Sequence, residues 1–436
     1  MTSGDTEQLL TEEDLGRLQL TTLQYYLHEV NPANGLIRDK TQRHAPASIA
    51  AVGLALASLP ILTQRGVISR EFAPELALKR LRFFRDSPHG PEPDATGYKG
   101  FYYHFLDMKS GRRVWNCELS TIDSAFLLAG MLTCAAYFDA DKPEEAEVRR
   151  LADELYARAD WQWALNGGPA VSHGWRPEDG FIPHYWKGYD EALLVCILGL
   201  GSPSFPLAEE NYAAYCSTYQ WREIYGREVL YSGPLFTHQL SHLWIDFRGI
   251  RDKFMRNHNA DYFENTRQAT YVHQAYAIDN PRGFAGYGEY GWGITAADGP
   301  GWTKRMSSGV EREFYDYIAR GVPDGPDDGT LAPWVVLASL PFAPEIVIPT
   351  INHMAQLHIG VNSRYGFKPS FNPTFEVPDS PTGWWISPYH FGVDQGPVIL
   401  MIENYRTGLI WNIMRRSPYV ISGLKRAGFT GGWLES

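Results

Sequence analysis

The hydrophobic positions of this chain recur mostly with a helical period, and they do so in two different ways. Segments 46–60 and 191–200 are apolar on nearly every side, whereas 143–160 pairs an apolar stripe with a charged face. A helix that is apolar all round must be enclosed by other protein, while an amphipathic helix faces water on one side. The periodicity predicts helices over the ranges 11–28, 46–64, 70–86, 118–138, 143–164, 189–200, 207–224, 236–256, 260–278, 331–340, 344–358, 394–414 and 418–427.

Enclosed and water-facing helices alternate along the chain, which predicts an all-α fold: an (α/α)6 barrel, a toroid of inner and outer helices in six pairs. No low-complexity linker divides the sequence, so we expect one domain over 1–436, with 1–10 flexible. Loops this long are usually functional, and we expect a few short strands in them around a cleft. These Gly-, Pro- and aromatic-rich connections cover 87–116, 165–188, 279–305 and 359–393.

Carboxylates stand in these loops and at the starts of the predicted inner helices, surrounded by Trp, Tyr and Gly. In a toroid the ends of the inner helices converge on one face, so acids far apart in sequence can share a single cleft. A pair of carboxyl groups is what glycoside hydrolysis requires, one to protonate the leaving oxygen and one to activate water or attack the anomeric carbon. The acids are Asp39, Glu118, Asp123, Asp190, Glu191, Glu289, Asp298, Asp394 and Glu403.

Some of these acids also fit purely structural roles. Asp123 lies three residues after Ser120, as in a capping box. Glu403 is placed to pair with Arg406 on a helix. Glu289 has no helix to cap, because Gly, Tyr and Trp surround it.

The adjacent Asp190 and Glu191 are expected in the first turn of a helix, where the macrodipole favours negative charge, so that simple capping is an alternative role. The dipole lowers a carboxyl pKa, whereas a general acid requires a raised one. Desolvation by Trp186 and Tyr189, together with repulsion from Asp190, would have to outweigh the dipole at Glu191.

Composition narrows the class of protein. Lys and Arg number 39 against 50 Asp and Glu, a net charge of −11 without an extended basic run, so nucleic acid is not expected as a partner. Aromatic residues make up 14% of the chain and suit the faces of sugar rings. The sequence shows no signal peptide and no apolar stretch of membrane-spanning length. We therefore expect no membrane association and a cytoplasmic protein, or a periplasmic or secreted one if an export signal has been removed.

Metal and cofactor sites are not predicted. The four cysteines show no CxxC spacing and are interpreted as buried thiols. His238 and His242 lie four residues apart with Asp246 one turn on, but no HExxH glutamate stands between them. There is no P-loop, no dinucleotide-binding GxGxxG after a strand and no GxSxG elbow.

Four segments, taken together, resemble the glucoamylase-like (glycoamylase) domain family, which includes bacterial endo-β-1,2-glucanases and is similar to a domain of cyclic β-1,2-glucan synthases. The resemblance runs from about residue 20 to 430. It implies an (α/α)6 barrel and a hydrolase or transglycosylase acting on β-linked glucan, commonly β-1,2-glucan. The segments are STIDSAFLLAGML (120–132), WKGYDEALLVCILGLGSPSFPL (186–207), FTHQLSHLWIDFRGIRD (236–252) and GYGEYGWGITAADGPG (286–301).

The resemblance also implies roles for particular residues. It marks Glu191 as the general acid, Asp394 as the general base of an inverting reaction, and Asp123 as a substrate-site carboxylate or alternative base. Trp292 is expected to stack on a sugar. The other candidates for substrate binding are Asp39, Glu118, Trp186, Tyr189, Asp190, Glu289 and Tyr290.

Three other functions remain open at this point. They are a retaining β-1,2-glucan transglycosylase, a polysaccharide lyase that uses Tyr and His within 257–276, and a glycan-binding protein without catalysis. An oligo- or polysaccharide is the expected partner in the hydrolase and transglycosylase cases, and the oligomeric state is not predicted.

Overall fold

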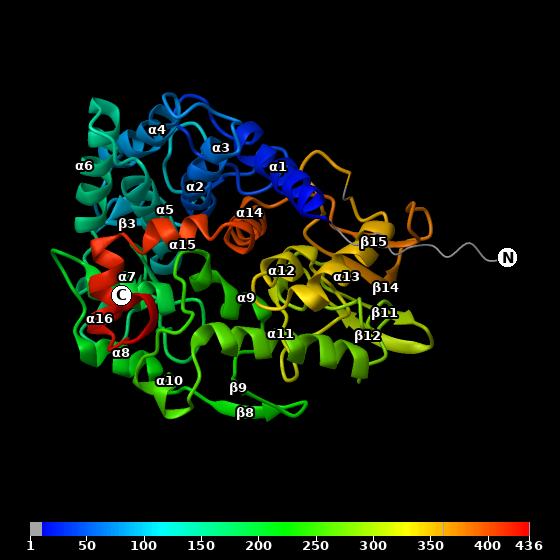
Figure 1. Ribbon diagram of the computed structural model, residues 1–436. Helices are drawn as coiled ribbons and strands as arrows, with labels where there is room; N and C mark the ends of the chain where they lie inside the picture. Colours follow the sequence, from blue (N-terminus) through cyan, green and yellow to red (C-terminus); the bar gives the residue numbers. More distant parts are fainter. Residues whose placement is uncertain (1–10, 361, 436) are drawn as a thin grey trace.

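The computed structural model describes residues 11–360 and 362–435, so the predicted flexibility of 1–10 lies outside it. Helices dominate, and they are joined by long loops (Figure 1). The α-helices are α1 Glu12–His28, α2 Ile49–Ala57, α3 Leu59–Gln64, α4 Ala73–Asp86, α5 Thr121–Tyr137, α6 Pro143–Ala157, α7 Leu193–Gly201, α8 Glu209–Cys216, α9 Leu235–Gln239, α10 Lys253–Asn257, α11 Tyr262–Asp279, α12 Pro333–Ala338, α13 Pro344–Gln356, α14 Gly392–Arg406, α15 Leu409–Met414 and α16 Pro418–Arg426.

Six of these helices form an inner ring: α2, α5, α7, α9, α12 and α14. Along the ring α2 packs against α5, α5 against α7, α9 against α12, α12 against α14, and α14 back against α2. Between α7 and α9 the ring is joined by a hydrogen bond of 3.1 Å from the Leu194 N–H to Ser241 Oγ, in the 3₁₀ turn Leu240–Leu243 that follows α9. The outer helices α1, α4, α6, α8, α11 and α13 alternate with them along the chain, which confirms the predicted toroid.

Three of the inner helices, α2, α7 and α12, are enclosed because their sequences have no polar face. Every residue of α2, α7 and α12 is buried. Between α2 and α5 the approach is so close that a Cβ on Gly53 would lie 2.3 Å from Phe126 O, and one on Gly130 would lie 2.0 Å from Gly53 O. Glycine at both positions is what allows these two helices to touch through their backbones.

Short strands lead into the inner helices at one end of the ring. Ser48 and Ser120 each close a short strand, and each hydroxyl accepts a hydrogen bond from the first turn of the following helix, α2 or α5. Strand order in the largest sheet is β2-β3-β5-β6-β7. The strands are β1 Ala47–Ser48, β2 Gly97–Tyr98, β3 Phe101–Tyr103, β4 Phe105–Leu106, β5 Leu119–Ser120, β6 Gly174–Arg176, β7 Gly180–Phe181, β8 Trp221–Ile224, β9 Arg227–Leu230, β10 Ala296–Ala297, β11 Thr303–Ser307, β12 Val310–Phe314, β13 Ile318–Ala319, β14 Phe371–Glu376 and β15 Trp384–Ile386.

Several predicted helices are shorter or interrupted. The helix expected over 207–224 ends at Cys216, and its last part is strand β8, which pairs with β9 in a hairpin. The prediction for 394–414 is broken where Gly408 takes a left-handed φ of 67° between α14 and α15. The helix expected from residue 189 begins at Leu193, so Asp190 and Glu191 lie in the turn before it. This last difference matters for the site.

Candidate active site

A pocket of about 420 Å³ lies where the inner ring meets the loops. Five of the predicted acids line it: Asp39, Asp123, Glu191, Asp298 and Asp394. The structure therefore brings together carboxylates that are up to 355 residues apart in the chain. Aromatic rings supply much of the remaining wall, namely Phe105, Trp115, Phe126, Phe236, Tyr317, Trp334 and Phe391.

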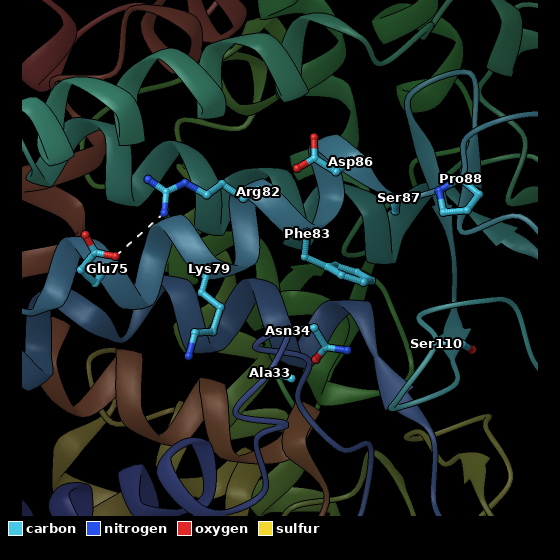
Figure 2. Close-up of a pocket in the computed structure, with 10 residues that line it drawn as sticks. All are labelled: Ala33, Asn34, Glu75, Lys79, Arg82, Phe83, Asp86, Ser87, Pro88 and Ser110. Atoms are coloured by element: carbon cyan, nitrogen blue, oxygen red, sulfur yellow. Dashed lines mark ion pairs between the residues drawn. The ribbon is translucent and has the colours of Figure 1, made fainter.

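A larger hollow of about 540 Å³ lies on the outer side of the molecule along α4 (Figure 2). Lys79 and Arg82 extend from the helix there, and Arg82 pairs with Glu75 at 3.9 Å. None of the acids predicted for catalysis lines this hollow. We therefore take the pocket at the inner ring as the candidate active site.

Glu191 extends into the pocket from a turn that hydrogen bonds fix at Asp190 and at the Glu191 backbone. The Asp190 carboxylate accepts hydrogen bonds from the Ala192 N–H at 2.9 Å and from the Tyr215 hydroxyl at 3.2 Å. The Ser241 hydroxyl donates to Glu191 O at 2.9 Å. Asp190 does not line the pocket. It fixes the turn, and its predicted contact with substrate has no support in this arrangement.

The electrostatic environment of Glu191 favours the protonated acid. Burial, followed by repulsion from Asp190, raises the pKa of Glu191 to about 8. Burial likewise raises the pKa of Asp190, although hydrogen bonds from Ala192 and Tyr215 oppose this. Desolvation therefore outweighs any effect of the nearby helix, and Glu191 carries a proton at neutral pH.

Asp394 is the most enclosed acid of the pocket. It lies in the first turn of α14 and is 3% exposed, and its Oδ2 is buried without a hydrogen-bond partner among the described residues. Burial raises its pKa well above the usual value, and Asp39 and Asp298 raise it further. A buried oxygen without a partner is costly unless a ligand or water satisfies it. The pocket side of Asp394 is thus suited to hold a polar group that is not part of the protein.

Asp123 is part of an array that the sequence did not reveal. His104 lies between two acids: its Nδ1 is 2.9 Å from Glu118 Oε1, and its Nε2 is 3.6 Å from Asp123 Oδ1. Burial lowers the pKa of His104, but Asp123, Glu118 and Asp39 together raise it to about 9. His104 is therefore a cation at neutral pH and holds both carboxylates in place.

The helix-capping role expected for Asp123 is present in part. Its backbone N–H donates to Ser120 Oγ at 3.2 Å, and the Ser120 hydroxyl donates to Asp123 Oδ2 at 2.5 Å. Ligand atoms of His104, Glu118 and Asp123 lie within 4.8 Å of one another, close enough to hold a metal ion. A metal-binding imidazole must be unprotonated, however, and the raised pKa of His104 opposes that.

Further charged groups complete the pocket. Burial raises the pKa of Asp39 to about 6, against the opposing charges of His104 and Lys40. Lys40 lines the pocket with its ammonium 5.2 Å from the centre of the Phe391 ring. Asp298 also lines it and accepts a hydrogen bond of 2.8 Å from the Ser387 hydroxyl. Lys40 follows directly on Asp39 in the sequence, which was the one signal that could have pointed to it.

The prediction that Trp292 stacks on a sugar is wrong. Its side chain is fully buried in the core, and its indole N–H donates to Thr350 Oγ1 at 2.8 Å. Glu289 is exposed and does not line the pocket, nor does Tyr290, whose ring lies 6.0 Å from that of His353. The Gly-rich sequence around Trp292 suggested a loop that faces the cleft, but the Trp292 side chain packs into the core.

Trp186 and Tyr189 lie behind the pocket wall and do not line it. The Trp186 indole N–H donates to Thr121 Oγ1 at 2.9 Å, and its ring stacks on His173 at 3.8 Å. Tyr189 is 6% exposed, with its ring 5.6 Å from that of Tyr262. Both support the elements that carry Asp123 and Glu191, and their predicted contact with substrate is not supported.

The histidines considered for metal binding, His238 and His242, are core residues. His238 hydrogen-bonds Ser232 O at 3.1 Å, His242 hydrogen-bonds Thr266 Oγ1 at 3.0 Å, and burial lowers the pKa of both. Residues 257–276, which the lyase alternative requires, contribute nothing to the pocket lining. No Tyr or His of 257–276 is therefore placed in the pocket to act in the lyase alternative.

Comparison with known proteins now identifies the family. Residues 183–418 match the model of the Glycoamylase family, described as "Putative glucoamylase". The chain belongs to this family. A crystal structure of a "putative glucoamylase" from Bacteroides uniformis ATCC 8492 is 32% identical, with a TM-score of 0.85, and the match covers 98% of this chain and all of that one.

Two further comparisons link the glycoamylase chain to enzymes with named substrates. An exo β-1,2-glucooligosaccharide sophorohydrolase (non-reducing end) from Parabacteroides distasonis is 27% identical over 97% of this chain, which spans 59% of that relative's length. A crystal structure of a β-1,2-glucanase from Parabacteroides distasonis is 26% identical, with a TM-score of 0.83, and the match covers 96% of this chain and 60% of that one. Within the described residues, no helix has the length and hydrophobicity needed to cross a membrane.

Proposed function

We propose that this chain is a glycoside hydrolase that cleaves β-1,2-linked glucan or its oligosaccharides and inverts the configuration at the anomeric carbon. The observation that carries the proposal is the pocket itself, in which two carboxyls with raised pKa values, the partly buried Glu191 and the buried Asp394, share one aromatic wall. The linkage is proposed from the names of the two Parabacteroides distasonis relatives. One domain over the whole chain stays a prediction.

Glu191 is the proposed general acid. Protonating the glycosidic oxygen requires a carboxyl that still holds its proton near neutral pH. The pKa of about 8 at Glu191 meets this requirement, and the turn fixed by Asp190 and Ser241 holds the side chain at the pocket. After the C–O bond breaks, the leaving sugar takes the proton and Glu191 is left as a carboxylate.

Asp394 is the proposed general base. Its Oδ2, which has no hydrogen-bond partner among the described residues, is suited to accept a hydrogen bond from the water that attacks the anomeric carbon. The raised pKa makes Asp394 a stronger proton acceptor than a surface aspartate, but only above that pKa is it ionised. Lys40 and the cationic His104 reduce the mutual repulsion of the acids around it.

Asp123 is proposed as a substrate-binding carboxylate and not as the base. Ser120 and His104 already engage its oxygens, so it is less free than Asp394 to take a proton from water. Asp39 has a pKa of about 6 and faces the same space, and it is proposed to bind a sugar hydroxyl.

The proposal is tested by incubating the purified protein with linear glucans of different β linkages. New reducing ends and oligosaccharide products are measured over time. We expect cleavage of β-1,2-glucan, and strong loss of it in Glu191→Gln. Glu289→Gln is the matched control, since it changes an exposed glutamate outside the pocket and should keep wild-type activity. No new reducing ends from any β-glucan would refute hydrolysis, and redistribution of chain lengths without new ends would indicate the transglycosylase.

A further inference from the structure

Trp115 is an exposed aromatic residue at the mouth of the pocket. It lines the pocket, yet 66% of its surface is exposed. Among the large apolar side chains that are exposed in the described residues, the only other one on the pocket wall is Tyr317. Tyr317 lines the pocket together with the carboxylates Asp39 and Asp394. Trp115 is the more exposed of the two, and a large apolar ring in water gains little for folding.

The backbone at Trp115 adopts a conformation that its side chain disfavours. Trp115 and Asn116 have φ values of 59° and 51°, and the Cys117 N–H donates to Val114 O at 3.1 Å across them. A two-residue turn with positive φ at both central positions is the kind usually built from Asn and Gly. Tryptophan at its first position is unfavourable for the turn, and such strain concentrates at ligand-binding sites.

The surrounding contacts hold this turn in place. Val114 N–H donates to Phe105 O at 3.2 Å, and Arg113 Nε donates to Cys117 O at 2.6 Å. The Trp115 side chain therefore projects from a fixed support. Its exposure comes from the turn and not from a loose segment.

A row of rings connects Trp115 to the acids. Its ring centre lies 5.3 Å from that of Phe105, and the Phe105 ring stacks on His104 at 3.9 Å with an angle of 13° between the planes. His104 in turn contacts Glu118 and Asp123. One wall of the pocket thus runs without interruption from a carboxylate array to an exposed indole.

We propose that Trp115 is the stacking platform of an outer sugar subsite, which binds a glucose unit of the β-linked chain beyond the units held at the carboxylates. The apolar face of a glucopyranose ring matches an exposed indole, and a neutral sugar needs no counter-charge there. This inference rests on the proposed function, since it assumes a β-glucan chain in the pocket. Trp115 then sets the preference for longer over shorter substrates.

The test compares Trp115→Asn with Trp115→Tyr and with the wild type. Asparagine tolerates positive φ, so Trp115→Asn should fold with an unchanged or higher melting temperature while removing the ring. We expect KM for long β-1,2-glucan chains to rise about tenfold, since loss of one aromatic contact is worth about a factor of ten, while kcat stays within about twofold. For the disaccharide sophorose KM should not change, and Trp115→Tyr should retain most of the affinity.

Trp302→Ala is the matched control, because Trp302 is 67% exposed but does not line the pocket. An equal rise in KM for Trp302→Ala, or an unchanged KM for Trp115→Asn at every chain length, would overturn the proposal. So would a fall in kcat on all substrates with no dependence on length.

Calorimetric binding of β-1,2-glucan oligosaccharides separates this inference from the proposed function. The titration uses Glu191→Gln with and without Trp115→Asn. In one outcome, loss of Trp115 weakens binding of the longer oligosaccharides about tenfold while the wild type cleaves no glucan. That result would support Trp115 as the stacking platform and would refute the proposed hydrolysis. If the two proteins bind all chain lengths equally, or neither binds any, the platform is refuted.

Discussion

Replacing the carboxyl of Glu191 with an amide should make the protein more stable at alkaline pH while it removes catalysis. In the folded protein burial and Asp190 raise the pKa of Glu191 from 4.5 to about 8. Between these two pH values the unfolded chain has lost the proton that the folded chain keeps. The free energy of unfolding therefore falls as pH rises from 4.5 to about 8, and the cost is complete above pH 8.

The size of this cost follows from the pKa. A rise from 4.5 to about 8 corresponds to on the order of 5 kcal/mol, since each pKa unit is worth about 1.4 kcal/mol. Because Glu191 is only partly buried and faces a pocket that admits water, we expect about half of this, ~2–3 kcal/mol. For a chain of 436 residues the unfolding entropy makes each kcal/mol worth roughly 1 °C in melting temperature.

Thermal unfolding of Glu191→Gln and wild type should therefore differ by about 2–3 °C near pH 9 and by nothing near pH 4, where both side chains are neutral. The same variant should lose activity by at least ~10²-fold, the usual contribution of a general acid. Glu289→Gln provides the control, with no change in either measurement because that side chain is exposed. A variant as stable as, or less stable than, the wild type near pH 9 would show that Glu191 is well solvated and would refute the reasoning.

Four further predictions concern the pH profile, the fold, the His104 array and the stereochemistry. The pH profile of kcat/KM should be bell-shaped, falling near pH 8 as Glu191 loses its proton and rising at a pH well above the usual aspartate range as Asp394 ionises; a profile flat through pH 8 would contradict the acid assignment. Trp292→Ala should lower the free energy of unfolding by ~3–5 kcal/mol, measured by denaturant unfolding, because it empties a core position; a loss under about 1 kcal/mol would contradict this. His104→Gln should lower kcat/KM by about tenfold or more with a changed pH profile, because Asp123 loses its cationic partner; an unchanged profile would make His104 a packing residue only. Proton NMR of the first product should show the α anomer, and a β product would remove Asp394 as the base of an inverting reaction.

The positions of the main helices were predictable because buried helices have a recognisable pattern of apolar residues in the sequence. The inner helices α2 and α7 are apolar all round, and periodicity alone predicted helices there, although over the different ranges 46–64 and 189–200. The β8–β9 hairpin was missed because its strands carry charged residues and follow a helix without an obvious break. The interruption at Gly408 depends on a single left-handed residue, which a period spanning many residues does not detect.

The candidate site was predictable where a carboxylate adjoins the start of an inner helix. Asp123, Glu191 and Asp394 all satisfy this condition, and the ring brings them to one pocket. His104 was missed because its partners Glu118 and Asp123 are 14 and 19 residues away, with no regular spacing to suggest contact. Trp292 was misassigned because a tryptophan in a Gly-rich loop has the same sequence appearance whether it faces a cleft or the core.

The pocket shows how one place in a fold can hold acids in different protonation states. The long inner helix α14 begins there, and its dipole favours an ionised carboxylate at Asp394. At Glu191 and Asp394 burial acts more strongly and raises the pKa. At Glu118 burial acts in the same direction, but the hydrogen bond and charge of His104 outweigh it and hold the pKa below its usual value. The cationic His104 thus accounts for the lowered pKa of Glu118, whereas Glu191, whose pKa burial raises to about 8, can give its proton to a substrate near neutral pH.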